Sequence, residues 1–600
     1  DDFNDFLLHV DGYLCELKDA QIRDGLHTLG QAPAGEQRLG LVLAMLRLDN
    51  GPVRSLRGAL AAMAGLHYQA ILDTPGAPFH APLPPFLSTS ASAVYTQSDV
   101  LDRLEGAART LLEHLDAQHW APEAVAPLVS QHLGRADVEV CKTLRFACEV
   151  IVPRLARTPD EIANMLRALG GEYVPAGPSG APTRGLAHVL PTGRNFYSVD
   201  PKALPSPIAY QVGCDLARGL LEKYLAEEGT YPESVGIVVW GTSAMRTHGD
   251  DIGEVLALLG VRPVWQTESR RVTGIEVITL AELGRPRIDV TLRISGFFRD
   301  AFPNLVHLVD SAIQTVAQLD EPLEQNFVRK HSLADQTAYA TAGMAPAEAQ
   351  ARSLYRVFGS KPGTYGAGIL PLLDERNWRS DQDLAAVYVA WGGYAYTQDT
   401  YGAEAASECK TRFAQMAIAV KNQDNREHDI FDSDDYMQYH GGMVATVRAL
   451  TGRNPKAYFG DSSDPGRSRV RELADEARRV FRTRVVNPKW VQSMQRHGYK
   501  GAFEMAATVD YLFGYDATAQ VVEDWMYTQL TEQYVLDPQV QQFFQEKNPW
   551  ALRNIIERLT EAVQRGLWEQ PDAALLAQMQ QVYLQLEGTL EDRTDTQSYI

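Results

Sequence analysis

The residues most suited to chemistry lie in the acidic segment NQDNREHDIFDSDDYMQYHGG, residues 422–442. Six carboxylates and one histidine fall within the twelve positions 424–435. Like charges this close cannot all stay ionised once they are removed from water, so a buried segment would take up a proton or bind a cation. A solvated acidic turn is the alternative, and spacing alone does not exclude it.

A helical conformation would give this segment a metal-binding face. Asp424, His428, Asp432 and Asp435 recur at intervals of three and four residues, which places them along one side of a helix. Mixed carboxylate and imidazole ligands suit Co²⁺, Zn²⁺ or Fe²⁺ better than Ca²⁺, which prefers oxygen alone. These four residues are therefore candidate metal ligands.

Two further segments could bind an anion. Residues 240–251, WGTSAMRTHGDD, follow a short strand pattern and could direct backbone N–H groups at a ligand beside His248, although an ordinary turn would look the same. Arg329, Lys330 and His331 form a basic cluster in an acidic protein and could neutralise ligand carboxylates. A solvated helix end would have the same composition as this cluster.

A fourth segment combines aromatic and basic side chains. Residues 487–504 set Trp490, Arg496, His497 and Lys500 around a glycine. Aromatic faces beside cations suit a large, flat, anionic ligand. Core aromatics next to a surface turn would give the same pattern.

The elements that must position these residues fall into three regions. Residues 1–170 show helical periodicity, interrupted by a proline-rich loop at 73–93. Residues 171–330 alternate short strands with helices, which predicts a parallel sheet whose ligands bind at the carboxyl ends of strands. Residues 331–600 are mostly helical and close with a helical cap. The predicted fold class is α/β multidomain, with mostly helical N- and C-terminal parts around a parallel-sheet α/β domain.

Composition limits the classes of function. The net charge of −20 opposes binding to nucleic acid, because a phosphate backbone needs a basic face. No run of about eighteen apolar residues occurs, which argues against a membrane span. The five cysteines form no CxxC pair and read as reduced, mostly buried thiols. A cytoplasmic location is expected.

Several long stretches resemble the large tetrapyrrole-binding subunits of the class I chelatases, the family shared by magnesium chelatase and aerobic cobaltochelatase. They are GRNFYSVDPKALPSP, YPESVGIVVWGTSAMRTHGDDIGEVLALLGVRPVW, LGRPRIDVTLRISGFFRDAFPN, EPLEQNFVRKH and NPKWVQSMQRHGYKGAFE. The stretches NQDNREHDIFDSDDY and WGGYAY favour the cobaltochelatase (CobN-type) branch.

The resemblance implies a function. Such subunits bind the metal-free macrocycle, here hydrogenobyrinic acid a,c-diamide on the route to cobalamin, together with Co²⁺ as a substrate. Two AAA+-type partner subunits hydrolyse ATP with Mg²⁺, and no cofactor is expected to be tightly bound by this chain. The match begins partway through the family sequence, and the upstream motif HGxLEWLPGK is absent. The chain is therefore expected to correspond to the C-terminal half.

The resemblance also suggests roles in the acidic segment. Asp432 falls on an aspartate that the magnesium branch also keeps, so we take it as proton acceptor or metal donor. His428 and Glu427 are the next catalytic candidates, and Asp424 and Asp435 support them.

Charge and shape indicate the residues that bind the substrate. Basic side chains would neutralise its peripheral carboxylates, and one tryptophan would pack on a ring face. This set comprises Arg329, Lys330, His331, Trp490, Arg496, His497, Lys500 and His248.

Three alternatives remain open at this stage. The first is a non-catalytic scaffold that docks AAA+ partners. The second is the related magnesium chelatase large subunit acting on protoporphyrin IX. The third is an independent α/β enzyme that binds a sugar or nucleotide phosphate at residues 241–251.

Overall fold

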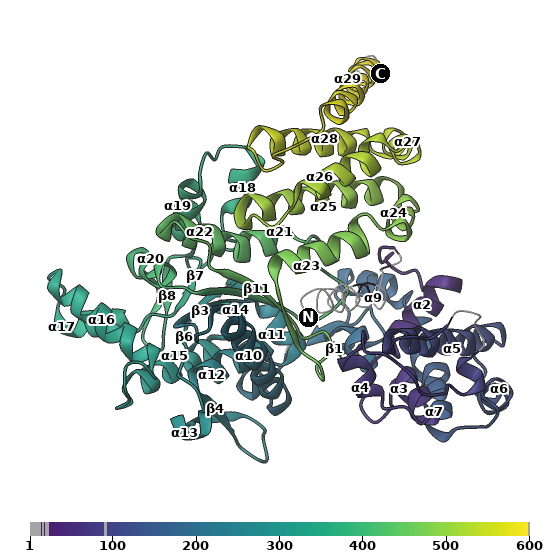
Figure 1. Ribbon diagram of the computed structural model, residues 1–600, viewed down its shortest axis with the longest axis horizontal. Coiled ribbons are helices and arrows are strands. Elements are labelled where there is room, and N and C mark those ends of the chain that lie inside the picture. The colour runs from purple at the N-terminus through teal and green to yellow at the C-terminus, as the bar shows by residue number, and fades with distance from the viewer. Residues whose placement is uncertain are drawn as a thin grey trace. The chain divides into compact units, whose positions relative to one another are not determined.

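The computed structural model describes residues 25–88, 93–197 and 199–597, together with residues 14, 17 and 23 (Figure 1). The chain divides into two units. The first comprises residues 1–198 and 482–493, and the second comprises residues 199–481 and 494–600. Each unit has its own hydrophobic core.

The first unit is helical, as the periodicity predicted. The 21-residue helix α5 begins after Thr96, whose hydroxyl accepts from the Asp99 N–H while the Asp99 carboxylate accepts from Thr96. Its leucines form one buried face in the core of the unit. The helices of this unit are α2 (Gly35–Met45), α3 (Leu56–Met63), α4 (Tyr68–Asp73), α5 (Gln97–Ala117), α6 (Val125–Leu133), α7 (Val138–Phe146), α8 (Val152–Leu155) and α9 (Asp160–Leu169), followed by the parallel strand pair β1 (Ala176–Pro178) and β2 (Asn195–Tyr197).

The second unit is built on an eight-stranded sheet with the order β12-β11-β10-β3-β6-β7-β8-β9. The run β11-β10-β3-β6-β7 is parallel, and the outer strands pair in antiparallel fashion. The strands are β3 (Ser234–Val239), β6 (Asp289–Ile294), β7 (Val357–Gly359), β8 (Tyr394–Tyr396), β9 (Tyr401–Glu404), β10 (Ile418–Gln423), β11 (Lys456–Asp461) and β12 (Arg469–Glu472). The predicted parallel sheet is confirmed, and six of its eight strands lie beyond residue 330.

Two further strands lie outside this sheet. Strands β4 (Val261–Trp265) and β5 (Val272–Val277) pair with each other as a separate antiparallel ribbon.

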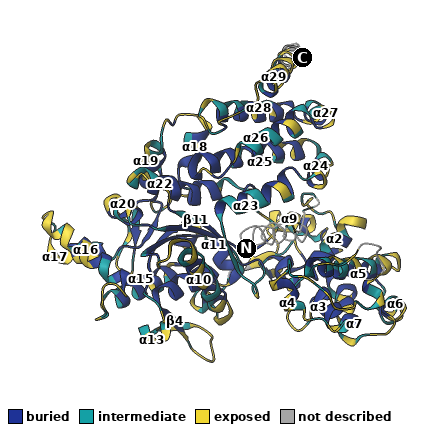
Figure 2. Ribbon diagram, in the orientation of Figure 1, coloured by how far each residue is buried: buried dark blue, intermediate teal, exposed yellow. Residues whose placement is uncertain are grey.

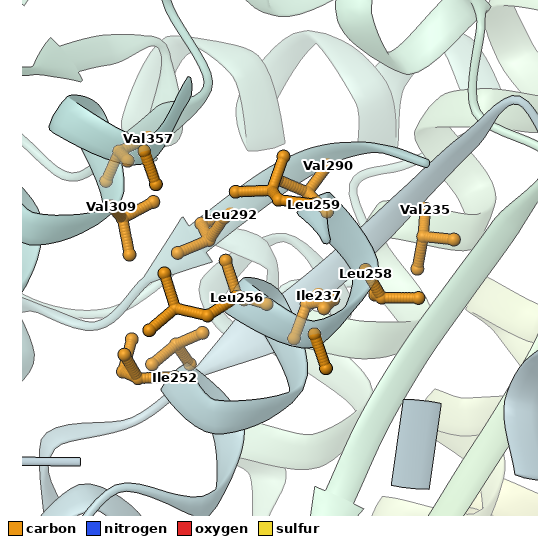
Figure 3. Close-up of a cluster of buried hydrophobic side chains, with 14 of the residues drawn as sticks. Val235, Ile237, Ile252, Leu256, Leu258, Leu259, Val290, Leu292, Val309 and Val357 are labelled. Carbon is orange, nitrogen blue, oxygen red and sulfur yellow. The ribbon is translucent and has the colours of Figure 1, made fainter. Parts of the chain in front are cut away.

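Helices cover both faces of the sheet. Figure 3 shows Ile252 and Leu256 of α12 (Asp250–Leu259) packed against strand residues such as Ile237 and Leu292. On the other face, a Cβ added to Gly236 would lie 2.7 Å from the sulfur of Met443 in α22 (Gly442–Thr451). All six residues of β3 are buried, as expected for a parallel strand covered on both sides.

The remaining helices complete the second unit, and α25 packs against α28 within the C-terminal layer (Figure 1). Figure 2 shows α12 and the central strands as buried, whereas much of α16 and α17 is exposed. These helices are α10 (Pro207–Glu228), α11 (Gly241–Thr247), α13 (Leu280–Leu283), α14 (Gly296–Ala301), α15 (Pro303–Ala317), α16 (Phe327–Thr341), α17 (Pro346–Ser353), α18 (Ile369–Asp374), α19 (Asp381–Gly392), α20 (Ala406–Ala414), α21 (Asp434–Tyr436), α22 (Gly442–Thr451), α23 (Leu473–Val480), α25 (Gly498–Ala519), α26 (Asp524–Leu530), α27 (Pro538–Lys547), α28 (Pro549–Gln564) and α29 (Ala573–Gln597), with α24 (Pro488–Gln495) at the junction of the units.

Two predictions from composition can be compared with these elements. Among the described residues, no helix is both long and apolar enough to span a membrane. Cys141, Cys148 and Cys409 are buried and unpaired, Cys214 is half-buried and unpaired, and Cys15 lies outside the described residues.

Candidate functional site

The candidate site lies at the edge where the parallel strands end, which we call the carboxyl edge. Strands β3 and β10 are parallel neighbours, so the segments that follow them emerge side by side. Arg246 of α11 follows β3, and Asp424 follows β10. The Arg246 Nε and Nη2 atoms each donate to one Asp424 carboxylate oxygen at 2.8 Å. This two-point ion pair fixes the start of the acidic segment to α11.

The acidic segment is a strand end and a loop rather than a helix, so the helical face that its spacing would allow does not form. No regular helix occurs between residues 424 and 433, and α21 starts only at Asp434. Side-chain oxygens here accept from backbone N–H groups that a helix would use for its own hydrogen bonds. The His428 N–H donates to Asn425 Oδ1 at 3.2 Å, and the Phe431 N–H donates to Asp429 Oδ1 at 2.9 Å. Such local bonds favour turns over helix.

The predicted metal ligands therefore do not converge in the described structure. Asp424 is buried against Arg246, while His428 and Asp435 are exposed and Asp432 is half-buried. Across the described ranges, no group of three or more His, Cys, Asp or Glu side chains is arranged to hold a metal ion. The predicted four-residue ligand set is not preassembled.

Two of the acidic residues have features that bear on proton transfer. The Asp432 Oδ2 atom accepts from the Asp429 N–H at 2.7 Å, which orients this half-buried carboxylate. Desolvation together with the charge of Asp434 raises the pKa of Asp435 to about 6, although its side chain reaches the surface. Glu427, on the same segment, is half-buried and accepts from the Arg426 N–H at 3.2 Å.

Next to the Arg246–Asp424 ion pair lies a buried polar cluster of Asn422, Asp251 and Glu254, which we call the buried layer and which the sequence analysis missed. The Asn422 amide donates to Asp251 Oδ1 at 3.0 Å and to Glu254 Oε2 at 2.5 Å. Burial, opposed by the bond from Asn422, raises the pKa of Glu254 to about 8. Burial also raises the pKa of Asp251. A glutamate inside the otherwise apolar run IGEVLALL was the available signal.

The opposite face of β10 carries a buried cation. Successive strand residues point to opposite faces, so Lys421 lies on the other side of the sheet from Asn422. The Lys421 ammonium is fully buried, lies 4.3 Å from the centre of the Trp240 ring and donates to the Asn422 carbonyl. Burial lowers the pKa of Lys421. The Trp240 ring in turn contacts Tyr436 edge-on at 4.9 Å.

The predicted anion loop at 240–251 is mostly helix. Residues from Gly241 onward form α11, and the Gly241 N–H donates to Ser295 Oγ at 3.3 Å rather than pointing at an open space. His248 is exposed at the end of α11, where it adopts a left-handed φ of 60°. This segment positions Arg246 instead of forming a phosphate cradle.

The basic cluster of Arg329, Lys330 and His331 lies at the opposite, amino edge of the sheet, where the parallel strands begin. The Lys330 ammonium contacts Glu233, which precedes β3, at 2.7 Å. The His331 Nδ1 atom lies 2.8 Å from Asp289, the first residue of β6. A six-residue strand spans roughly 17 Å. The cluster therefore lies at the other end of the strands from the acidic segment, and its predicted role in neutralising substrate carboxylates remains a prediction.

The remaining substrate-binding candidates lie in different units. Trp490 belongs to the first unit, is only 4% exposed and is covered by the Arg484 guanidinium, 4.9 Å from its ring centre. Its predicted role as an open ring platform is not compatible with this burial. Arg496 and Lys500 are exposed, and His497 is half-buried, near the start of α25 in the second unit. A role for these three residues remains a prediction.

Comparison with known proteins assigns the family. The family model described as CobN/Magnesium Chelatase matches residues 1–575. The chain belongs to this family. Members of the CobN/magnesium chelatase family that it resembles include both cobalt and magnesium enzymes.

The chain is 46% identical over 579 residues to the aerobic cobaltochelatase subunit CobN of Pseudomonas aeruginosa, covering 96% of this chain and 45% of that protein. It is 29% identical over 610 residues to a magnesium-chelatase subunit of Chlorobaculum parvum, covering 99% of this chain and 45% of that protein. The solved catalytic subunit of cobaltochelatase from Mycobacterium tuberculosis matches with a TM-score of 0.88 and 55% identity, over 98% of this chain and 47% of that chain. The chain thus spans about half the length of these relatives.

Proposed function

We propose that this chain is part of the tetrapyrrole- and metal-binding large subunit of an aerobic cobaltochelatase. The reaction is the insertion of Co²⁺ into hydrogenobyrinic acid a,c-diamide. The observation that carries this proposal is the likeness to the Mycobacterium tuberculosis catalytic subunit, which extends over 98% of the chain at 55% identity. The same protein's name states a catalytic role in cobaltochelatase, which favours an enzyme subunit over a non-catalytic scaffold.

Insertion exchanges one Co²⁺ for two protons of the macrocycle, so the site must remove water from the ion and accept protons. Carboxylates and an imidazole suit both tasks near neutral pH. We assign these tasks to Asp432, His428 and Glu427, whose side chains lie on the loop at the carboxyl edge and reach solvent to differing extents. Asp435, with a pKa of about 6, is a further proton acceptor.

Asp424 receives a different role from that expected of a metal ligand. Both of its carboxylate oxygens accept from the Arg246 guanidinium, so binding a cation there would require breaking a buried ion pair. We assign Asp424 to anchoring the loop. The proposed metal-contacting residues are then His428 and Asp432, with Asp435 as an additional candidate. In this proposal the loop closes around the ion only when macrocycle and metal are bound.

The wider assembly follows from the family function. Two AAA+-type subunits hydrolyse ATP with Mg²⁺ and drive the conformational change that brings metal and macrocycle together. Cobalt and the macrocycle are substrates, and the complex works in the cytoplasm. The magnesium chelatase alternative, with protoporphyrin IX as substrate, is less favoured because identity is 29% to the Chlorobaculum parvum protein but 46% to the Pseudomonas aeruginosa protein.

The central test is Asp432→Asn in the full-length protein reconstituted with its ATP-hydrolysing partners. The amide keeps an oxygen that can accept from the Asp429 N–H but removes the negative charge. Cobalt insertion should fall by at least about a hundredfold, while macrocycle affinity, measured by fluorescence quenching, stays within about tenfold. The matched control is Asp399→Asn in an exposed loop. Insertion at the wild-type rate in the Asp432 variant would remove Asp432 from the mechanism.

A further inference from the structure

Two carboxyl groups of α12 converge on one hydrogen-bond donor. Asp251 and Glu254 lie three residues apart, on one side of the helix, and each accepts from the same Asn422 nitrogen. Their side chains are 3% and 0% exposed. Asp251 Oδ2 and Glu254 Oε1, the other oxygen of each group, have no hydrogen-bond partner among the described residues. A buried polar atom without a partner is costly, so both oxygens favour a shared proton.

Two glycines allow neighbouring elements to pack closely against α12 and Asn422. From α10, Gly213 approaches so closely that a Cβ there would lie 2.3 Å from the Glu254 nitrogen. From β11, a Cβ on Gly460 would lie 2.0 Å from Asn422 Oδ1. Glycines on two packed elements thus bring backbone close to the backbone of α12 and to the Asn422 side chain.

Several charged groups act on the pair. The cations are Arg246 of α11 and, from the opposite face of β10, Lys421. The carboxyl groups are those of the pair itself, Asp424 beyond β10, and Asp250 of α12, which accepts from Ser462 at 3.2 Å. Among these groups, four carboxyl groups outnumber two cations, and burial disfavours the ionised form of all four. Protonation of one member of the pair reduces this excess, in agreement with the pKa of Glu254 of about 8.

We propose that Asp251 and Glu254 share one proton and act as positioning residues for the proposed chelation site. With the proton in place, the field of Arg246 is directed at Asp424 and holds the acidic loop in position. Release of the proton to solvent in alkaline solution adds a negative charge behind Arg246 and Lys421, weakens this hold and lowers the insertion rate. The positioning role rests on the proposed function, whereas the shared proton does not.

The shared proton is tested by infrared spectroscopy of the purified chain at neutral pH. The difference spectrum, wild type minus the Glu254→Gln variant, should show the C=O stretch of one protonated carboxyl group. This band should shift when the solvent is exchanged for D₂O. The control difference with Glu268→Gln, an exposed glutamate of the same unit, should lack that band. Asp251→Asn provides a second variant should Glu254→Gln fold poorly. The absence of the band from both difference spectra would overturn the proposal.

The positioning role is tested by the pH profile of insertion in the full-length complex. Glutamine mimics the protonated acid, so the alkaline limb of the kcat profile should move up by at least about one pH unit in Glu254→Gln, with KM for the macrocycle within about twofold. A merely structural role would lower kcat equally at every pH, and that result would reject positioning. A wild-type complex that inserts no cobalt would instead reject the proposed function, and the infrared result would still decide whether the proton is shared.

Discussion

The two edges of the parallel sheet bury similar side chains in opposite electrostatic states. At the amino edge, Asp289 is 1% exposed and accepts from Arg356 at 2.7 Å, His331 at 2.8 Å and Arg412 at 3.3 Å. At the carboxyl edge, Glu254 is equally buried but accepts from one amide only, and its second oxygen has no partner within the described chain.

The pKa values of Asp289 and Glu254 differ because their hydrogen-bond partners differ, although both groups are buried. Burial alone would raise the pKa of Asp289, but the charges of Arg356, His331 and Arg412 hold it well below its usual range. Glu254 lacks such cations at hydrogen-bond distance, so burial raises its pKa. At the amino edge, the buried Asp289 carboxylate is surrounded by hydrogen-bonded cations. At the carboxyl edge, a buried carboxyl group lacks such partners and has a raised pKa, and groups with strongly shifted pKa values are typical of functional sites.

The largest expected effect comes from breaking the amino edge. Asp289→Ala leaves Arg356 and Arg412 buried with fewer counter-charges, and the free energy of unfolding should fall by about 3–5 kcal/mol. Urea denaturation followed by tryptophan fluorescence measures this loss. Asp399→Ala, at an exposed position, is the control. A loss below about 1 kcal/mol would show that the network contributes little.

At the carboxyl edge, Arg246→Met removes the partner of the buried Asp424 carboxylate. Because Arg246 itself is 28% exposed, the expected loss of stability is smaller, about 2–3 kcal/mol. Adding Asp424→Asn should recover part of this loss, because the buried charge is then gone. A double-mutant cycle from thermal unfolding gives the coupling energy, and additive effects of the two substitutions would contradict a direct pair.

The pH dependence of stability distinguishes the two edges further. Glu254 has a folded-state pKa of about 8 against an ordinary value of 4.5, so the folded protein binds more protons than the unfolded chain between these values. Wild-type stability is therefore lost as pH rises through this window. Glutamine does not titrate, so the Tm of Glu254→Gln minus that of wild type should grow from about pH 5 to about pH 8. A difference constant over this range, as expected for the control Glu268→Gln, would contradict the raised pKa.

The smallest effect is expected from the half-buried cations of the amino edge. Arg329→Met with Lys330→Met should change macrocycle affinity by less than about twofold, because these side chains lie at the other end of the strands from the acidic loop. Fluorescence quenching titration in the full-length protein measures the affinity. Weakening by tenfold or more would place substrate contacts at both edges.

Local patterns predicted much of the fold. The short strand pattern before residue 240 predicted β3, and the alternation of strands and helices over residues 171–330 predicted elements such as α12 and β6. Strands β7 and β8 were not anticipated, because three residues are too few to show a period. The helical face proposed for the acidic segment failed because side chains of Asn425 and Asp429 bond the local backbone.

The site was predicted less completely than the fold. The sequence directed attention to the acidic segment and to the segment after β3, which do meet at one edge. It did not show that Arg329, Lys330 and His331 lie at the other edge, because nothing in a local motif states at which end of a strand it will lie. It passed over Glu254, whose position inside an apolar helix was the available clue.

By itself, the sequence determined the periodicities that form the helices and strands, the acidic character of the loop and the motifs that mark the family. Only the tertiary structure decided which carboxylates are paired and which are left with an unsatisfied oxygen. The physical reason is that ionisation depends on burial and on neighbours brought from far along the chain. Asn422 and Asp251, which set the state of the buried layer, are separated by 171 positions.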